Sequence, residues 1–511
     1  MTETPSFRSY VEKILDALAA DPERTVIEYE TRQMGAKTLR TLIYTLARAM
    51  ADEGVRRGQT VTLLSGNLPE ILAARYAANL LGCRVNYLYQ GKSARTQAAI
   101  VEDVETRVLI ADPRMARRAA QITEMASVEL LFTLGPAPVG RDLLELAARQ
   151  SQQPLTSSAR AQDVCLLRHT GGTTGHPKAI CRTYGLLNAL PQLVDLDHGQ
   201  TRCRFLLCTT LAHMAGTLAD QALEAGGCVV LLEDFDPATV LATIEAKGIT
   251  ELFVAPGLLY QLTDHPDAAH RDLSSLTHIL YCGYGASPAR LADALRRFGQ
   301  ILVQAYGQLE TGIVTVLSAH DHGRPALLRT AGKPLPDREV VIMDSSGRHL
   351  PTGEAGEICV RSPTMMDGYW KRPELTAEVI GDGWVHTGDI GSLDQEGYLT
   401  VMDRLKDIII VRGGCHVYPT ELEDVLNAHQ DVLHSAVFGV RDADGREQVH
   451  AAVVPVAHSA VSEADLHQRI QEHLGPMYLP ASLTFVDALP LTSPGKPDKD
   501  LLRGRVRDDA V

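Results

Sequence analysis

Short apolar runs alternate with helical segments through the first three hundred or so residues of the chain. The runs are continuously apolar rather than alternating, which is typical of strands buried on both faces of a parallel sheet. Residues 69–81 fit a helix that opens with Pro69 and stops before Gly82. The pattern therefore predicts an α/β fold in which helices cover parallel sheets. The apolar runs are residues 61–64, 108–111, 130–134, 164–167, 229–232, 252–255, 279–282 and 301–304.

The sequence pattern changes near Glu339, where short strands and Gly/Pro turns replace the alternation of apolar runs and helical segments. Strands are expected at residues 340–343 and 357–361, so the segment predicts a β-rich subdomain. Farther along, expected strands at 398–402 and 408–411 flank the charged stretch 403–407. A charged stretch between two strands is ordinarily a solvated turn.

Composition narrows the function classes. A chain of 511 residues allows about three domains or lobes, and 45% apolar residues can fill their cores. The net charge of −14, without a Lys/Arg run, argues against a nucleic-acid partner. Nine cysteines without a Cys-x-x-Cys pair predict a reduced, cytoplasmic protein with no structural zinc. The N-terminus has no apolar signal core, and no apolar run approaches the ~20 residues that span a bilayer.

Residues 169–178, HTGGTTGHPK, are the most informative segment for chemistry. Glycines allow backbone N–H groups to approach an anion, threonine hydroxyls add donors, and Lys178 adds a positive charge. The spacing does not fit the common P-loop, because His176 or Pro177 stands where its second glycine should be. The residues alone leave two interpretations open, a polyphosphate-binding loop and a polar Gly/Thr turn.

The loop resembles the signature of adenylate-forming enzymes, the family of acyl-CoA synthetases, luciferases and peptide-synthetase adenylation domains. Further motifs occur in the family's order from about residue 20 to beyond residue 500, so the resemblance spans nearly the whole chain. These motifs are His213 in a TLAH segment, Tyr306-Gly307-Gln308-Leu309-Glu310, Gly356-Glu357, Thr387-Gly388-Asp389, Arg404 with Lys406, Gly413-Gly414, Tyr418-Pro419-Thr420-Glu421 and Pro494-Gly495-Lys496.

The resemblance implies a two-domain architecture. Residues 1–403 would form a large N-terminal domain with two parallel αβ-layered sheets plus the β-rich subdomain. Residues 404–511 would form a small, mobile α+β C-terminal lid that pivots near Lys406. Rotation of the lid would let two half-reactions share one site.

The chemistry implied by the resemblance is a ligation that uses ATP, Mg²⁺ and CoA. A carboxylate attacks the α-phosphate of ATP to give an acyl-adenylate and pyrophosphate, and a thiol then displaces AMP. Lys496 would neutralise the charge that develops in the first step, His213 would border the thiol tunnel, and Glu310 would act in catalysis by holding the metal. The implied ATP- and AMP-binding residues are Thr170, Gly171, Gly172, Thr173, Thr174, Gly175, Lys178, Gly285, Ala286, Tyr306, Gly307, Asp389 and Arg404.

The resemblance also indicates the branch of the family. Amino-acid-activating domains usually place an aspartate after the residue aligned with His213, but this chain has Met214. Gly413 and Gly414 would admit the pantetheine arm of CoA. The implied acyl pocket is small or apolar, which favours a fatty, aryl or terpenoid acid. Its residues are His213, Met214, Gly216, Gly257, Tyr260, Gly283, Tyr284 and Gly312.

Two departures from the family pattern keep alternatives open. Gly171 replaces a serine, and Leu309 replaces the threonine that precedes the glutamate. Each change removes a hydroxyl, and a hydrogen bond to a charged group is worth roughly 1.5–3 kcal/mol, unless Thr311, Thr173 or water compensates. The favoured function is an acyl-CoA synthetase. The alternatives are a ligase that loads an acyl carrier protein and a non-catalytic nucleotide- or acyl-binding protein; the sequence does not indicate the oligomeric state.

Overall fold

The computed structural model describes residues 7–169, 178–193, 202–411, 415–441, 447–492 and 496–508. Contacts within the chain divide it into two compact units. Unit 1 comprises Met1–Phe253, Arg271–His278 and Pro363–Glu378, and unit 2 comprises Val254–His270, Ile279–Ser362 and Val379–Val511. The predicted lid, residues 404–511, falls inside unit 2, and its boundary at Asp403 stays a prediction.

Unit 1 contains an eight-stranded sheet whose central strands are parallel. The strand order is β19 (Gly368–Tyr369), β9 (Ala179–Thr183), β8 (Val164–His169), β4 (Arg84–Tyr87), β3 (Thr60–Leu64), β5 (Thr106–Ala111), β6 (Leu130–Thr133) and β7 (Arg141–Asp142). The accompanying helices include α2 (Ala36–Asp52), α3 (Pro69–Leu80), α4 (Ala94–Asp103), α5 (Ala116–Met125) and α6 (Leu143–Ala148). The helix predicted at 69–81 is confirmed to within one residue, and Gly82 follows it with φ +73°.

A second set of strands in unit 1 has the order β12 (Glu251–Val254), β10 (Arg204–Leu207), β11 (Cys228–Leu231), β1 (Thr25–Tyr29) and β2 (Arg32–Gly35). Its strands are parallel except for the β1–β2 pair. In sequence, α8 (Met214–Glu224) connects β10 to β11 and α9 (Pro237–Lys247) connects β11 to β12. Such strand–helix–strand crossovers are what parallel pairing requires.

Unit 2 contains β13 (His278–Cys282), β14 (Leu302–Gln308), β15 (Gly312–Leu317) and β16 (Lys333–Pro334). The β13–β14 pair is parallel, whereas β14–β15 and β15–β16 are antiparallel. The predicted α/β fold with a β-rich subdomain is confirmed, and its two large sheets are mixed rather than parallel throughout. The reason is local: the turn between β14 and β15 is too short for a crossover helix, so the chain must reverse.

The predicted β-rich subdomain is an antiparallel sheet in unit 2. Its order is β17 (Glu339–Met343), β18 (Gly356–Arg361), β21 (Trp384–Leu393) and β20 (Ile380–Gly381), and β22 (Leu399–Arg404) pairs with β21. Buried Val314, Ile342, Ile358, Val360 and Leu399 form its core against β15. This sheet carries the predicted Thr387-Gly388-Asp389 motif.

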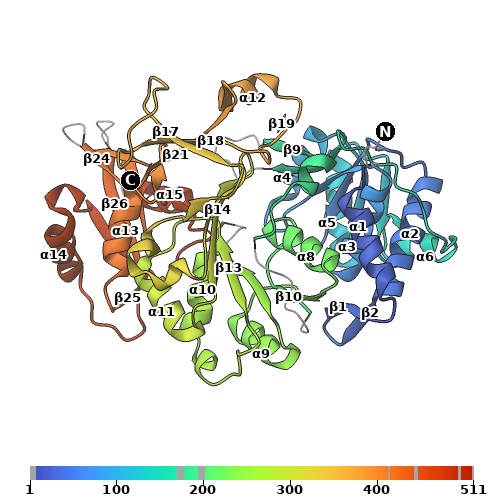
Figure 1. Ribbon diagram of the computed structural model, residues 1–511, viewed down its shortest axis with the longest axis horizontal. Helices are drawn as coiled ribbons and strands as arrows, with labels where there is room; N and C mark the ends of the chain where they lie inside the picture. The colour runs from blue at the N-terminus through green and yellow to red at the C-terminus, as the bar shows by residue number, and fades with distance from the viewer. Residues whose placement is uncertain are drawn as a thin grey trace. The chain divides into compact units, whose positions relative to one another are not determined.

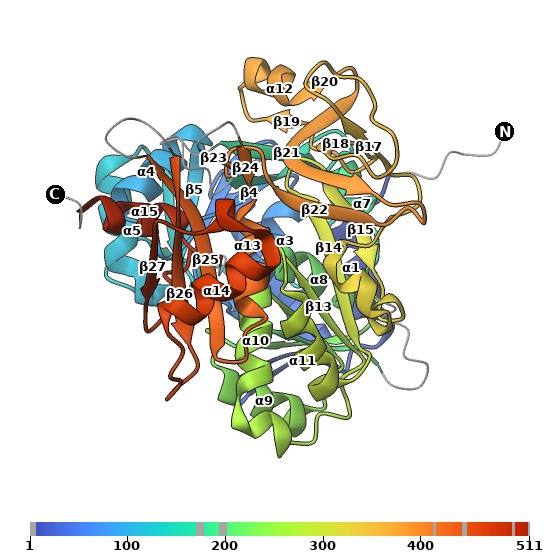
Figure 2. The same ribbon diagram turned by 90° about the vertical axis from the view of Figure 1, so that its left-hand side faces the viewer.

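The last part of unit 2, orange to red in Figure 1, is α+β. It contains the two-stranded pair β23 (Ile409–Val411) and β24 (Cys415–Val417) and a sheet of β25 (Val432–Arg441), β26 (Glu447–Pro455) and β27 (Ser482–Phe485). Helices α13 (Pro419–Asn427) and α14 (Glu463–Leu474) cover one face of the three-stranded sheet, and α15 (Lys499–Asp508) covers the other (Figure 2).

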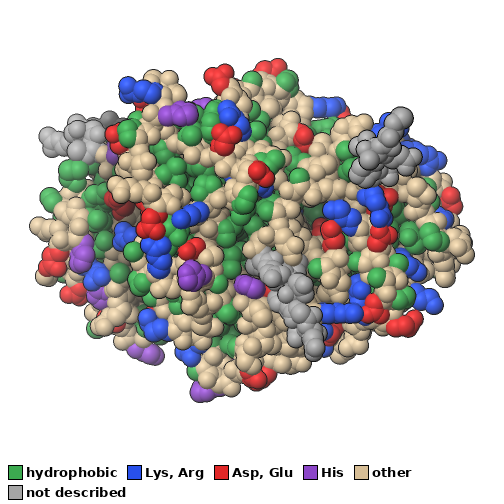
Figure 3. Space-filling model, in the orientation of Figure 1, with side chains coloured by type: hydrophobic (Ala, Val, Ile, Leu, Met, Phe, Trp, Pro, Cys, Tyr) green, Lys and Arg blue, Asp and Glu red, His purple; other side chains and the backbone are tan. Residues whose placement is uncertain are grey.

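The described surface carries charges of both signs. On the face drawn in Figure 3, Lys and Arg side chains are interspersed with Asp and Glu. Within the described ranges, no helix combines the length and apolar character that a bilayer crossing requires.

Candidate active site

The β14–β15 hairpin positions the first group of predicted residues. Glycine is required at Gly307, because a Cβ there would lie 2.0 Å from the Gly312 carbonyl oxygen. Gly312 begins β15 with φ +70°, which favours glycine. Glu310 lies in the turn that connects the two strands. The hairpin thus fixes Tyr306 and Gln308 on either side of a close backbone contact.

Replacing Gly307 by Ala should destabilise this hairpin. The added methyl group would require a backbone shift, for which overpacking costs of about 1–3 kcal/mol are typical. We expect a lower midpoint of thermal unfolding and weaker AMP binding, measured by calorimetry. Gly91→Ala is the matched control, because its Cβ would enter open space. Equal midpoints for the two variants would contradict the expectation.

Asp389 is the most buried charged group of the predicted site, with 4% of its surface exposed. Its Oδ2 accepts hydrogen bonds from Tyr306 Oη at 2.8 Å and from Gln308 Nε2 at 2.7 Å. Arg404 is its register partner across β21 and β22, and Nε of Arg404 lies 3.3 Å from Oδ1. Burial raises the pKa of Asp389, although the Arg404 charge and the two hydrogen bonds oppose the increase.

The carboxylate of Asp389 retains capacity for a ligand. A carboxylate offers about four lone-pair positions, and these contacts engage Oδ2 twice and Oδ1 once. Because the exposed Arg404 also faces Oδ1, the arrangement suits a ribose hydroxyl, which accepts and donates. The donor set therefore fits a nucleotide.

Lys496 lies beside the segment that follows β13. A Cβ at Gly283 would lie 3.7 Å from Lys496 Cε, so the lysine stem runs along this glycine, whose φ is +117°. The Lys496 backbone is held by Thr492, whose N–H donates to the Lys496 carbonyl oxygen at 2.7 Å. Burial, reinforced by the positive charge of Arg404, lowers the pKa of Lys496. Asp389 acts in the opposite direction, so these three charged groups share one electrostatic environment.

The segment around Gly283 packs against α10 (Pro256–Asp264). The Gly257 N–H donates to Tyr284 Oη at 2.6 Å, and the Ser287 N–H donates to Tyr260 Oη at 2.8 Å. Tyr260 is buried and stacks on His434 of β25, with ring centroids 5.5 Å apart. These contacts give both tyrosines a packing role, and their place in an acyl pocket stays a prediction.

Gly285 and Ala286 complete this segment. Gly285 is exposed, and a Cβ there would lie 3.9 Å from Cγ2 of Thr420, at the start of α13. Ala286 is half-buried. The segment therefore lies next to both the Lys496 side chain and the N-terminal turn of α13.

The predicted hinge is a tight turn. The Asp407 N–H donates to the Arg404 carbonyl oxygen at 2.9 Å, and Lys406 is exposed between them. Asp403, just before the turn, accepts from Thr420 N at 2.9 Å and from Thr420 Oγ1 at 3.1 Å. Asp403 thus caps the first turn of α13 from the preceding strand.

Unit 1 holds the other predicted residues. His213 is the N-cap of α8, and its ring stacks on Tyr89 with centroids 5.0 Å apart. Met214 is the first residue of α8. A Cβ at Gly216 would lie 2.1 Å from the Leu211 carbonyl oxygen, so packing alone requires this glycine. Lys178 lies with Nζ 5.3 Å from the centroid of the Tyr369 ring.

Several predicted residues lie outside the described residues. They are Thr170, Gly171, Gly172, Thr173, Thr174 and Gly175 of the phosphate loop, and Gly413 and Gly414 of the expected CoA tunnel. Their roles stay predictions.

Sequence reasoning missed Gln308 and Asp403 as positioning residues. Gln308 stands inside a motif that the resemblance had already identified, but only the fold shows its amide directed at Asp389. The Thr311 hydroxyl accepts from Gln308 N at 3.0 Å and donates to the Gly312 carbonyl at 2.9 Å. It therefore stabilises the turn, and its compensation for the hydroxyl missing at Leu309 stays a prediction.

Comparisons with known proteins identify the family of the chain. The AMP-binding enzyme family matches residues 15–370, and the AMP-binding enzyme C-terminal domain matches residues 421–496. The medium/long-chain-fatty-acid–CoA ligase FadD8 of Mycobacterium tuberculosis is 36% identical over 500 residues, which cover 94% of this chain and 87% of that protein. A feruloyl-CoA synthase from an Amycolatopsis species is 35% identical over 492 residues, 95% of this chain and 96% of that protein.

A solved structure extends the comparison. The amide bond synthetase McbA from Marinactinospora thermotolerans matches with a TM-score of 0.88 and 36% identity, over 97% of this chain and 99% of that chain. The family matches cover most of the chain and include Tyr306 in the first and Lys496 in the second. The chain therefore belongs to the AMP-binding, adenylate-forming enzyme superfamily and is an ATP-dependent ligase of carboxylic acids.

Proposed function

We propose that the chain is an AMP-forming acyl-CoA synthetase for a hydrophobic acid. The observation that carries the proposal is the shared environment of Lys496, Asp389 and Arg404 in unit 2, in a chain similar to a fatty-acid–CoA ligase and a feruloyl-CoA synthase. The acid and ATP first give an acyl-adenylate and pyrophosphate. CoA then displaces AMP to give the acyl-CoA.

In the first half-reaction, Lys496 is proposed to stabilise negative charge between the attacking carboxylate and the α-phosphate. Asp389 accepts the ribose hydroxyls, and the Tyr306 ring faces the adenine. Glu310, in the β14–β15 turn, is proposed to hold Mg²⁺, which when bound neutralises phosphate charge. Because Leu309 offers no hydroxyl, the Lys496 ammonium carries a larger share of this stabilisation.

The reduced pKa of Lys496 predicts a pH limit on adenylation. The ammonium is the active form, and its proton is lost as the pH rises through the lowered pKa. The adenylation rate should therefore fall on the alkaline side at a lower pH than a free lysine, with a pKa of about 10.4, would give. The pH profile of ATP–pyrophosphate exchange measures this limit. A descending limb centred at the free-lysine value would contradict the expectation.

In the second half-reaction, the lid, residues 404–511, is proposed to rotate about Lys406. The rotation would withdraw Lys496 from Gly283 and bring Gly413 and Gly414 to the site, where they admit the pantetheine arm. His213, stacked on Tyr89, is proposed to border the thiol path. One site can then serve both steps in sequence.

The acid is proposed to be fatty, aryl or terpenoid. Support comes from the apolar or small residues predicted for the pocket and from relatives named for medium/long-chain fatty acids and for feruloyl-CoA. The packing roles of Gly216 and Tyr260 remove two positions from those that can tune acid size without disturbing the fold.

The likeness to the amide bond synthetase McbA supports a second candidate, in which an amine accepts the acyl group from the adenylate. A carrier-protein phosphopantetheine is a third acceptor. The amide synthetase and the carrier-protein ligase share the first half-reaction with the acyl-CoA synthetase. Only the product of the second half-reaction distinguishes the three functions.

One experiment tests these functions. The full chain is incubated with ATP, Mg²⁺ and a panel of fatty, aryl and terpenoid acids, with CoA, a phosphopantetheinylated carrier protein or a small amine supplied in separate reactions. Mass spectrometry then detects the adenylate and the product. Formation of acyl-CoA supports the proposal. Acylated carrier protein alone, or amide alone, would instead identify the carrier protein or the amine as the acceptor of the acyl group. ATP binding without an adenylate from any acid would indicate a non-catalytic binding protein.

A further inference from the structure

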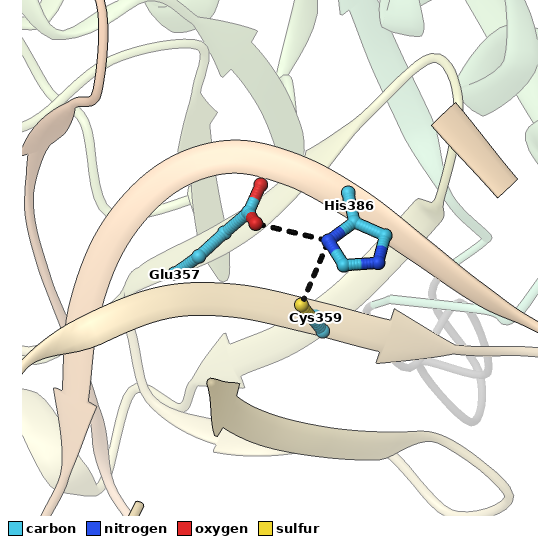
Figure 4. A group of neighbouring side chains, drawn as sticks. All are labelled: Glu357, Cys359 and His386. Carbon is cyan, nitrogen blue, oxygen red and sulfur yellow. Dashed lines mark hydrogen bonds and ion pairs between the residues drawn. The ribbon is translucent and has the colours of Figure 1, made fainter. Parts of the chain in front are cut away.

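Three potential metal ligands lie on one face of the antiparallel β17–β22 sheet. Cys359 on β18 pairs directly with His386 on β21. Glu357 precedes Cys359 by two residues on the same strand, so its side chain projects from the same face. Figure 4 shows the carboxylate, the thiol and the imidazole directed toward one another. The sheet register, rather than sequence spacing, brings these groups together.

The ligand atoms converge around Nδ1 of His386. Sγ of Cys359 lies 3.5 Å from Nδ1, and Oε2 of Glu357 lies 2.9 Å from it (Figure 4). All three ligand atoms lie within 4.8 Å of one another. Nδ1 of His386 can carry only one proton, yet it faces both the Cys359 thiol and the Glu357 carboxylate. A cation that replaces the proton would meet three donors without a change of strand register.

The burial of the cluster leaves an approach from solvent. Cys359 is fully buried, whereas the side chains of His386 and Glu357 are 34% and 24% exposed. A bound metal stabilises the thiolate form of a cysteine that ligates it.

The donor set selects the class of cation. Thiolate, imidazole and carboxylate are the ligand types of zinc, and a site with three protein ligands leaves the fourth zinc position open to water. Magnesium and calcium prefer oxygen donors only, so the sulfur disfavours them. We propose that Glu357, Cys359 and His386 form a zinc-binding site. The S–Zn and N–Zn bonds form as the thiol proton and any Nδ1 proton pass to the buffer.

The site adjoins the predicted nucleotide residues. The β18–β21 register shifts between the pairs Glu357–Ile390 and Cys359–His386, so Thr387-Gly388-Asp389 forms a bulge. Oε1 of Glu357 accepts from the Gly388 N–H at 3.0 Å, while Oε2 faces His386. Zinc can bind Oε2 without loss of the Gly388 hydrogen bond. The expectation of no structural zinc rested on missing Cys-x-x-Cys pairs, and this site needs none.

The test uses the full chain after removal of metals with a chelator. Co²⁺ is added first, because a thiolate ligand gives cobalt a near-ultraviolet charge-transfer band. Zn²⁺ is then titrated by calorimetry and by displacement of the cobalt. We expect one zinc per chain and a cobalt band that zinc abolishes. A wild-type chain without the band would overturn the proposal.

Variants assign the ligands. Cys359→Ala should abolish the band, and His386→Gln should weaken zinc binding by more than the ~10–100-fold that loss of an outer-shell partner costs. His386→Gln keeps the test valid if Cys359→Ala fails to fold, because His386 is partly exposed. Cys203→Ala, a buried thiol in unit 1, and His320→Gln, an exposed histidine, are matched controls. Zinc affinity of His386→Gln equal to that of the controls would refute the assignment.

Discussion

Replacing Lys496 by Ala should lower the rate of acyl-adenylate formation by on the order of 10²–10³-fold, the typical cost of losing one preorganised donor to a developing charge. Lys496 is half-buried beside Gly283 and shares its surroundings with Arg404 and Asp389. Its loss removes a cation from the position where two anions are expected to meet. ATP–pyrophosphate exchange with an accepted acid measures the effect.

AMP binding separates this catalytic role from a structural one. Asp389 keeps its hydrogen bonds from Tyr306 and Gln308 in the variant, so the AMP dissociation constant should change much less than the exchange rate. Lys37→Ala, an exposed lysine in α2, is the matched control and should leave both quantities unchanged. If Lys496→Ala exchanged pyrophosphate at the wild-type rate, Lys496 would not be the catalytic lysine.

Much of the fold could be predicted because its signals are local. Continuous apolar runs identified the buried strands, and Pro69 and Gly82 delimited α3. The antiparallel direction of β15 escaped this reasoning. β15 is apolar, as a parallel strand would be, and only the short turn after Gln308 makes it run antiparallel to β14.

The candidate site, like the fold, could be predicted from the sequence only in part. Motif order predicted Tyr306 and Asp389 as site residues, yet they are 83 residues apart in sequence, and nothing in either motif indicates their direct hydrogen bond. The roles of Gln308 and Asp403 depend on the bulge in β21 and on the placement of α13. The cluster of Glu357, Cys359 and His386 depends on strand register alone, so no sequence spacing predicts it.

Replacing Lys406 by Pro should reduce thioester formation by on the order of 100-fold, equivalent to about 2.7 kcal/mol in the barrier, while adenylation falls much less. Lys406 has a negative φ in the turn that Arg404 and Asp407 close, which is the sign that proline requires. Proline would then resist the dihedral change that lid rotation requires.

The two half-reactions of the Lys406 variant must be measured separately. Pyrophosphate exchange reports adenylation in the conformation in which Lys496 lies beside Gly283, and single-turnover transfer from preformed adenylate to CoA reports the second step. Lys406→Ala removes the charge without fixing φ, so it should retain both steps if the hinge acts through the backbone. Equal loss of both steps in Lys406→Pro would instead mean that the turn supports the site as a whole. In that case the hydrogen bonds that Thr420 donates to Asp403, rather than rotation about Lys406, would be the feature that connects the lid to catalysis.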